Sequence, residues 1–191
     1  GLSIVSGYGR ESSSGTFSIR TANAGEDGVS GRISVQSGDT TSGSSGDITF
    51  ISGSANLGAG GSISIIVGSG ANTTGGRLVI NSGSAASITG GAMSISSGFG
   101  RSSSSGTFSI RTNTGGSNGV SGGISLTSGS ATKGGSGNLT LRTGSATYGV
   151  SGSIEMLVGS GSLGTGGRFT MSAGVNSSAT GGSISMATGY G

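Results

Sequence analysis

The sequence predicts an all-β fold, a β-solenoid built from strand-turn units that are each about 15 residues long. A glycine recurs with a 15- or 16-residue spacing ahead of an apolar-Ser-apolar run, and six such units make a longer 91-residue repeat. Composition agrees with this pattern, because the 191 residues include 46 Gly and no Pro, with only 4% aromatic and 8% charged residues. Too few large side chains remain for a thick globular core, so any core must come from the stacking of repeats.

The short repeat is carried by the glycine that precedes each apolar-Ser-apolar run, and we call it the first glycine of the unit. Successive first glycines keep a 15-residue spacing, which lengthens by one residue before Gly31 and before Gly122. The first glycines are Gly15, Gly31, Gly46, Gly61, Gly76, Gly91, Gly106, Gly122, Gly137, Gly152, Gly167 and Gly182. Because the extra residue recurs in phase, it indicates a special corner of the repeat.

Alternation within each unit predicts strands of about six residues. Ile63 and Ile65, for example, fall on one side of an extended chain, because side chains two residues apart share a face. A second glycine follows seven residues after the first, as at Gly68, where we expect the chain to turn through a positive φ. Ala22 and Asn113 replace this second glycine in the 16-residue units, so a different corner is expected there.

The long repeat predicts a single continuous solenoid over residues 1–191, with super-repeats at 7–97 and 98–188. GYGRESSSGTFSIR, which starts at Gly7, returns as GFGRSSSSGTFSIR from Gly98. Both ends fall inside the pattern, so we expect the chain to be part of a longer array. Six units per super-repeat allow one, two or three units per coil, of which two or three bury the apolar faces best. An antiparallel meander and a flexible Gly/Ser linker are the weaker alternatives.

The residue types present argue against catalysis. The sequence has no Cys and no His, which removes disulfides, thiolate metal sites and the commonest general base. Residues 159–164 match GxGxxG, but no helix is expected after them to bind a phosphate. Acidic residues such as Glu26 and Asp27 do not recur with the period, as a calcium-binding β-roll would require. We therefore expect a protein that is not an enzyme, with no cofactor and no metal.

Charge and hydropathy exclude two further classes of partner. The net charge is +3 and the pI is about 10.0, but nine basic residues spread over the chain form no continuous stripe interleaved with aromatics. We expect no nucleic-acid partner. No run of about 18 apolar residues occurs, so no membrane span is expected either.

Two small sets of residues are candidates for surface roles. N-glycosylation sequons begin at Asn72, Asn138 and Asn176, and we expect modification there if the protein is secreted by a eukaryote. The aromatic residues at one equivalent loop position, Tyr8, Phe99 and Tyr190, are candidates for stacking on sugars, although packing against a neighbouring corner or filament is the more ordinary role.

The recurring words GGSIS, SGSA and GSG resemble the long Gly/Ser-rich repeat proteins of the surfaces of diatoms and other algae. This likeness spans the chain and implies an extracellular matrix, adhesive or cell-surface setting. The period alone resembles the coils of insect β-helical antifreeze proteins, which carry a regular Thr-x-Thr ladder. Here the outward positions are mixed, as at Thr16, Arg20 and Glu155.

The resulting hypothesis is a structural extracellular fibre, surface-layer or adhesive protein. We expect copies to associate end to end and laterally into filaments by β-strand stacking, because open solenoid ends expose unpaired strand groups. Polysaccharide is a further candidate partner. The alternative hypothesis is an ice-binding or carbohydrate-binding β-solenoid module.

Overall fold

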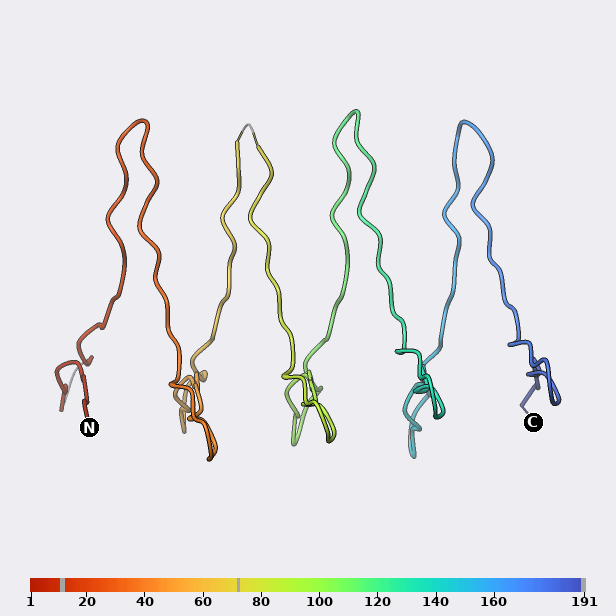
Figure 1. Cartoon of the computed structure of the whole chain (residues 1–191), viewed down its shortest axis with the longest axis horizontal. Coiled ribbons are helices and arrows are strands. Elements are labelled where there is room, and N and C mark those ends of the chain that lie inside the picture. The colour runs from red at the N-terminus through yellow and green to blue at the C-terminus, as the bar shows by residue number, and fades with distance from the viewer. Residues whose placement is uncertain (11–12, 72, 190–191) are drawn as a thin grey trace. The chain divides into compact units, whose positions relative to one another are not determined.

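The structure, a computed structural model, describes residues 1–10, 13–71 and 73–189, and it divides into two units, Gly1–Ser94 and Ile95–Gly191. Within the described ranges the chain contains neither an α-helix nor a β-strand; it consists of extended segments joined by bends (Figure 1). The prediction of an all-β solenoid is therefore wrong.

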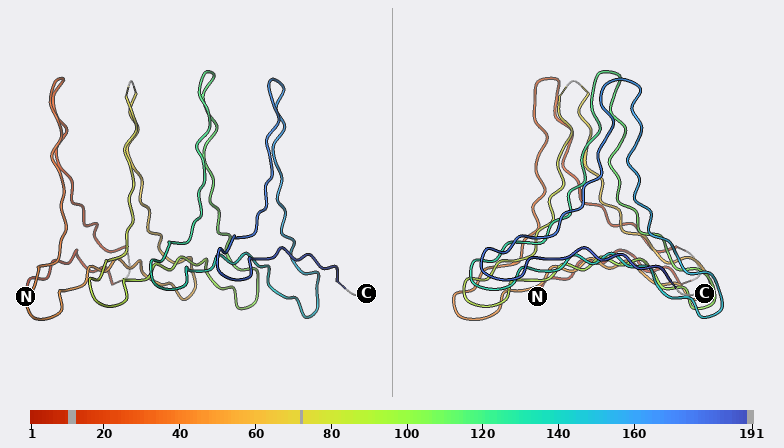
Figure 2. Two further views of the ribbon diagram at one scale, coloured as in Figure 1. Left: turned by 45° about the vertical axis from the view of Figure 1, so that its right-hand side comes forward. Right: turned by 90° about the vertical axis from the view of Figure 1, so that its right-hand side faces the viewer.

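The physical reason lies in the backbone hydrogen bonds. The described part of the chain has eight of them between backbone groups, and each joins residues at most eight positions apart. A globular chain of this length would contain roughly 130 backbone hydrogen bonds. In the Gly1–Ser94 unit, two extended segments flank the bend at residues 26–27 and run side by side in Figures 1 and 2. No ladder of hydrogen bonds joins them in the described residues, so alternation has produced extended backbone without a sheet.

Bends and turns follow the period of the sequence. In the Gly1–Ser94 unit, the bend at residues 56–58 follows the bend at 41–43 by one 15-residue repeat, and the bend at 86–88 follows two repeats later. In the Ile95–Gly191 unit, one 15-residue repeat again separates the bends at 132–134 and 147–149. Each unit of the repeat therefore contains one extended apolar segment and one loop that reverses or redirects the chain.

The ends of each loop meet at a close contact that we call the loop neck. It pairs the first glycine of a unit with the residue that ended the preceding extended segment, nine or ten positions earlier. A β-carbon built on the first glycine would lie within 4 Å of that residue's side chain in every unit. The pairs are Ser6/Gly15, Thr21/Gly31, Ser37/Gly46, Ser52/Gly61, Val67/Gly76, Ser82/Gly91, Ser97/Gly106, Thr112/Gly122, Ser128/Gly137, Thr143/Gly152, Val158/Gly167 and Ala173/Gly182.

Backbone hydrogen bonds reinforce half of these necks. The N–H of the first glycine donates to the carbonyl oxygen of the glycine eight residues earlier, at 2.9–3.0 Å. The six bonded pairs are Gly15 to Gly7, Gly61 to Gly53, Gly76 to Gly68, Gly91 to Gly83, Gly106 to Gly98 and Gly182 to Gly174. The second glycine thus serves as an acceptor at the neck. Among the described residues a positive φ occurs at Gly164 alone, so the predicted reason for the second glycine is wrong.

The two 16-residue units have a different loop, as expected from Ala22 and Asn113. In the first of them Gly28 donates its N–H to the Gly25 carbonyl at 3.2 Å, and Gly119 donates to Gly116 at 3.0 Å in the second. At the first of these necks the hydroxyl of Thr21 donates to the carbonyl of Gly31. The extra residue is therefore accommodated inside the loop, where a four-residue turn forms, and the neck itself is kept.

No residue of the described part is buried, so this part of the chain has no hydrophobic core of its own. Its accessible surface is 19283 Å², whereas a compact monomer of the same mass would expose about 8,000 Å² and a fully unfolded chain about 26,000 Å². The expectation that stacked coils of two or three units bury the apolar faces is therefore wrong for a single chain. Two apolar side chains per unit cannot cover each other when no second layer packs on them.

Candidate functional site

The apolar side chains of the extended segments form the main candidate interaction surface, which we call the alternating apolar positions. Ile63 is 57% exposed and Ile65 is 70% exposed. Within Ile95–Gly191, Phe169 is 54% exposed and Met171 is 51% exposed. Each of these side chains therefore keeps half or more of its surface available to a partner.

Apolar side chains in the bends form a second class. Leu57 and Leu163 are 105% and 94% exposed, so nothing in the described chain covers them. Residues at the bends differ from unit to unit, whereas the alternating apolar positions recur in each one. A partner that matches several units at once can therefore use the alternating positions, and it meets a different side chain at each bend.

The loop necks set where each extended segment begins. Their side chains are Ser, Thr, Ala or Val, and several of them are partly buried although the segments are exposed. Close approach explains the first glycine most clearly at Gly76 and Gly167, where a β-carbon would lie 2.5 Å from a Cγ1 atom of Val67 and of Val158. The period of the sequence predicts the first glycine but not its partner at the neck, which the Ser, Thr, Ala or Val ahead of each second-glycine position could have indicated.

Charged residues distinguish the two super-repeats. Three arginines of residues 7–97 recur in residues 98–188, since Arg10, Arg20 and Arg77 correspond to Arg101, Arg111 and Arg168. None of the acidic residues recurs. The first super-repeat has four arginines and five acids, hence a net charge of −1, and the second has five basic residues and one acid, hence +4. The described charged side chains are exposed.

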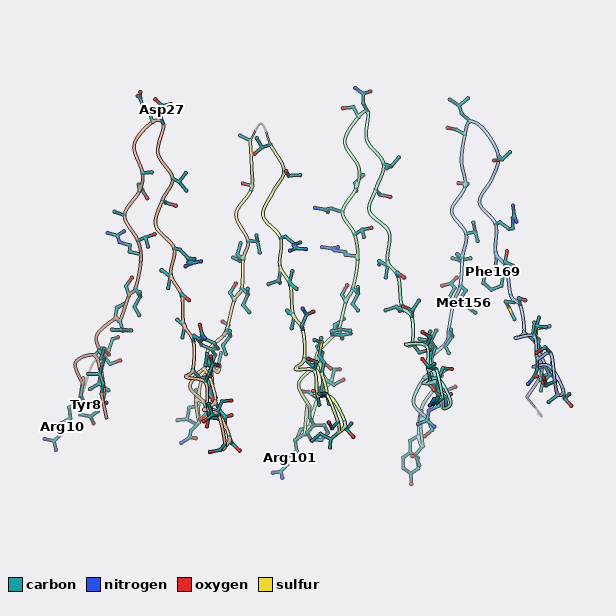
Figure 3. The ribbon with its side chains drawn as sticks, viewed as in Figure 1. Tyr8, Arg10, Asp27, Arg101, Met156 and Phe169 are labelled. Carbon is teal, nitrogen blue, oxygen red and sulfur yellow. The ribbon has the colours of Figure 1, made fainter. Side chains whose placement is uncertain are left out.

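The candidate loop aromatics are accessible. Tyr8 and Phe99 are each 88% exposed, at equivalent places in loops that also carry Arg10 and Arg101, and Figure 3 labels three of these four side chains. The remaining aromatic candidate, Tyr190, lies outside the described residues.

The sequons occupy exposed positions where the structure describes them. Asn138 is exposed, and Asn72 lies outside the described residues. Asn176 is also exposed, and its Oδ1 accepts hydrogen bonds from the backbone N–H groups of Ser178 at 2.8 Å and Ala179 at 2.9 Å. This arrangement fixes the bend at residues 177–179 through an Asx turn.

Features associated with other kinds of site are few. Arg20, Thr21, Ala22 and Asn23 line a shallow hollow of about 380 Å³ beside the first 16-residue loop. Over the described ranges, no three acidic, Cys or His residues come together in a group that could hold a metal ion. In those ranges the structure also has no helix long and apolar enough to cross a membrane.

Comparison with protein-family models, with curated proteins and with solved structures finds no match to this chain. Function must therefore be argued from the exposed repeat itself.

Proposed function

We propose that this chain is a structural protein of an extracellular fibre, surface layer or adhesive matrix, and that it acts by associating with further copies of itself. The supporting observation is the absence of any buried residue in the described part, together with a regular set of large apolar side chains that remain exposed. Monomeric soluble proteins rarely leave large contiguous apolar areas open to water, and such areas are typical of interfaces.

The accessible surface gives the scale of this interface. The chain exposes about 11,000 Å² more than a compact monomer of 17.8 kDa would. Obligate protein interfaces bury about 2,000–5,000 Å² in total, so several such interfaces fit on one chain. When a contact joins different surfaces of two copies, each new copy can repeat it, and an open filament grows if the rotation between copies does not close a ring.

The repeat supports a structural role in a second way. Because the same alternating apolar positions return in each unit, a contact made by one unit can be made again by the next. This role needs binding surfaces and no catalytic residues. An extracellular setting is the part of the proposal that rests on the Gly/Ser-rich composition and on the likeness to algal surface proteins.

Sedimentation velocity on the full chain between 1 and 100 µM tests the proposal, with electron microscopy of the same samples. We expect the weight-average mass to rise with concentration and regular assemblies to appear. A protein that sediments as a monomer over the whole range would contradict it, as would amorphous particles of irregular size. Immunolocalisation in the source cells separately tests the extracellular setting.

A further inference from the structure

The two super-repeats share their apolar pattern but differ in charge, and this difference bears on how copies pair. Residues 7–97 have a net charge of −1 and residues 98–188 a net charge of +4. The charged positions do not all vary between the super-repeats, because three arginines are retained at equivalent positions. It arises from acids of the first super-repeat, such as Glu26 and Asp27, which correspond to the neutral Ser117 and Asn118.

We infer that a second copy of this chain pairs so that the first super-repeat of one copy lies against the second super-repeat of the other. This inference rests on the self-association proposed above and specifies its register. Since both super-repeats present the same alternating apolar positions, apolar contacts alone do not choose between like and unlike pairing. The difference in charge between the super-repeats is what distinguishes like pairing from unlike pairing.

The charge products show which pairing is favoured. Pairing of like super-repeats gives products of +1 and +16, both repulsive, whereas each unlike pairing gives −4, which is attractive. At physiological ionic strength, interactions between exposed charges decay over about 8 Å, so charges across the contact outweigh those farther away. Unlike pairing therefore avoids the strong repulsion between two second super-repeats.

The charges at issue are available to a partner. Asp27 lies at the exposed bend that Figure 3 labels, and Asp39 and Asp47 are exposed as well. On the other side, Lys133 and Arg142 are exposed basic residues that have no basic counterpart in the first super-repeat. Glu11, which also contributes to the count of acids, lies outside the described residues.

Two variants that keep the net charge at +3 test the inference in opposite directions. In the first, Glu26→Ser and Asp27→Asn are combined with Ser117→Glu and Asn118→Asp, which exchanges the residues of two equivalent turns and makes the super-repeat charges +1 and +2. The product for unlike pairing then becomes +2. All four side chains are exposed, and the flanking glycines that close both turns are unchanged.

In the second variant, Arg32→Gly is combined with Gly123→Arg, its equivalent position, which makes the super-repeat charges −2 and +5. The product for unlike pairing becomes −10. Nothing lies within 4 Å of a β-carbon at Gly123, so the new side chain has room. Relative to the unaltered value of −4, the two variants change the charge product for unlike pairing by equal and opposite amounts. Neither variant removes an apolar side chain.

Sedimentation or light scattering on the full chain in 20 mM and 500 mM NaCl gives the readout. For charges about 10 Å apart across the contact, the first variant should associate roughly tenfold more weakly than the unaltered chain at 20 mM, and the second roughly tenfold more tightly. At 500 mM the three proteins should agree within about twofold.

Each outcome separates the two proposals. If all three proteins associate equally at both salt concentrations, or if both variants shift in the same direction, unlike pairing is wrong while self-association stands. If all three remain monomeric, the proposed function itself fails.

Discussion

Replacing Ile63 and Ile65 together by serine removes both alternating apolar side chains of one extended segment, and we expect weaker self-association. These side chains are 57% and 70% exposed, and that exposed part is what a second copy can cover. Complete burial of an aliphatic side chain contributes about 2 kcal/mol, so the pair contributes about 2.5 kcal/mol per contact. The dissociation constant should therefore rise roughly 70-fold.

The matched control is Leu57→Ser with Leu163→Ser, which removes two apolar side chains from bends. These side chains are 105% and 94% exposed, so association through any exposed apolar surface would lose about 4 kcal/mol, more than for the isoleucine pair. We expect the opposite order, because the bends differ between units and cannot match a partner repeatedly.

Sedimentation velocity at matched concentrations measures both variants against the unaltered chain. The reasoning is refuted if the leucine variant loses as much affinity as the isoleucine variant or more. Equal affinity of the isoleucine variant and the unaltered chain would likewise show that the alternating apolar positions do not form the contact.

Three further predictions concern the loops. Gly76→Ala should accelerate amide exchange at residue 76 at least tenfold, because a β-carbon there would lie 2.5 Å from Val67 Cγ1 and must open the neck. Gly68→Ala is the control and should leave this rate unchanged, because nothing lies within 4 Å of a β-carbon at that position. Equal exchange rates in the two variants would contradict the neck. Asn176→Ala should accelerate exchange of the amides of Ser178 and Ala179 by about tenfold, because both donate to the Asn176 side-chain oxygen. Asn176→Asp keeps this acceptor and should exchange as slowly as the unaltered chain. Fast exchange in the Asp variant would contradict the Asx turn. When the chain is secreted from a eukaryotic cell, it should lose mass on treatment with an N-glycosidase. The loss should disappear in the triple variant Asn72→Gln, Asn138→Gln, Asn176→Gln. A secreted chain that carries no glycan would contradict glycosylation at these sequons.

The period of the fold was accessible from sequence because it is set locally. A glycine that recurs with a 15-residue period marks a place where two parts of the chain come close, and the bends at 41–43 and 56–58 follow that spacing. The in-phase extra residue also indicated the different loop that contains Gly25 and Gly28. These features depend on residues within one unit.

The absence of a sheet from the described residues was not accessible from sequence, because alternation and pairing are separate properties. Ile63 and Ile65 share a face on any extended chain, but a strand also needs a neighbouring backbone at about 4.8 Å along a ladder of hydrogen bonds. Alternation predicts the first condition and is silent on the second. Likewise, the pattern identified Tyr8 and Phe99 as exposed loop aromatics without indicating what they contact, and it identified Asn176 as a sequon without its Asx turn.

The free-energy cost of ordering the backbone links the fold of this chain to its proposed function. Fixing the backbone costs roughly 1–2 kcal/mol per residue, and burial of apolar surface is the main term that offsets this cost in folded proteins. Here the described residues bury no side chain, and their eight backbone hydrogen bonds, six at loop necks and two in turns, contribute only about 1 kcal/mol each. The isolated chain therefore lacks the usual source of stability. Because a second copy can supply the missing burial at every alternating apolar position, association and ordering of this chain should be thermodynamically coupled.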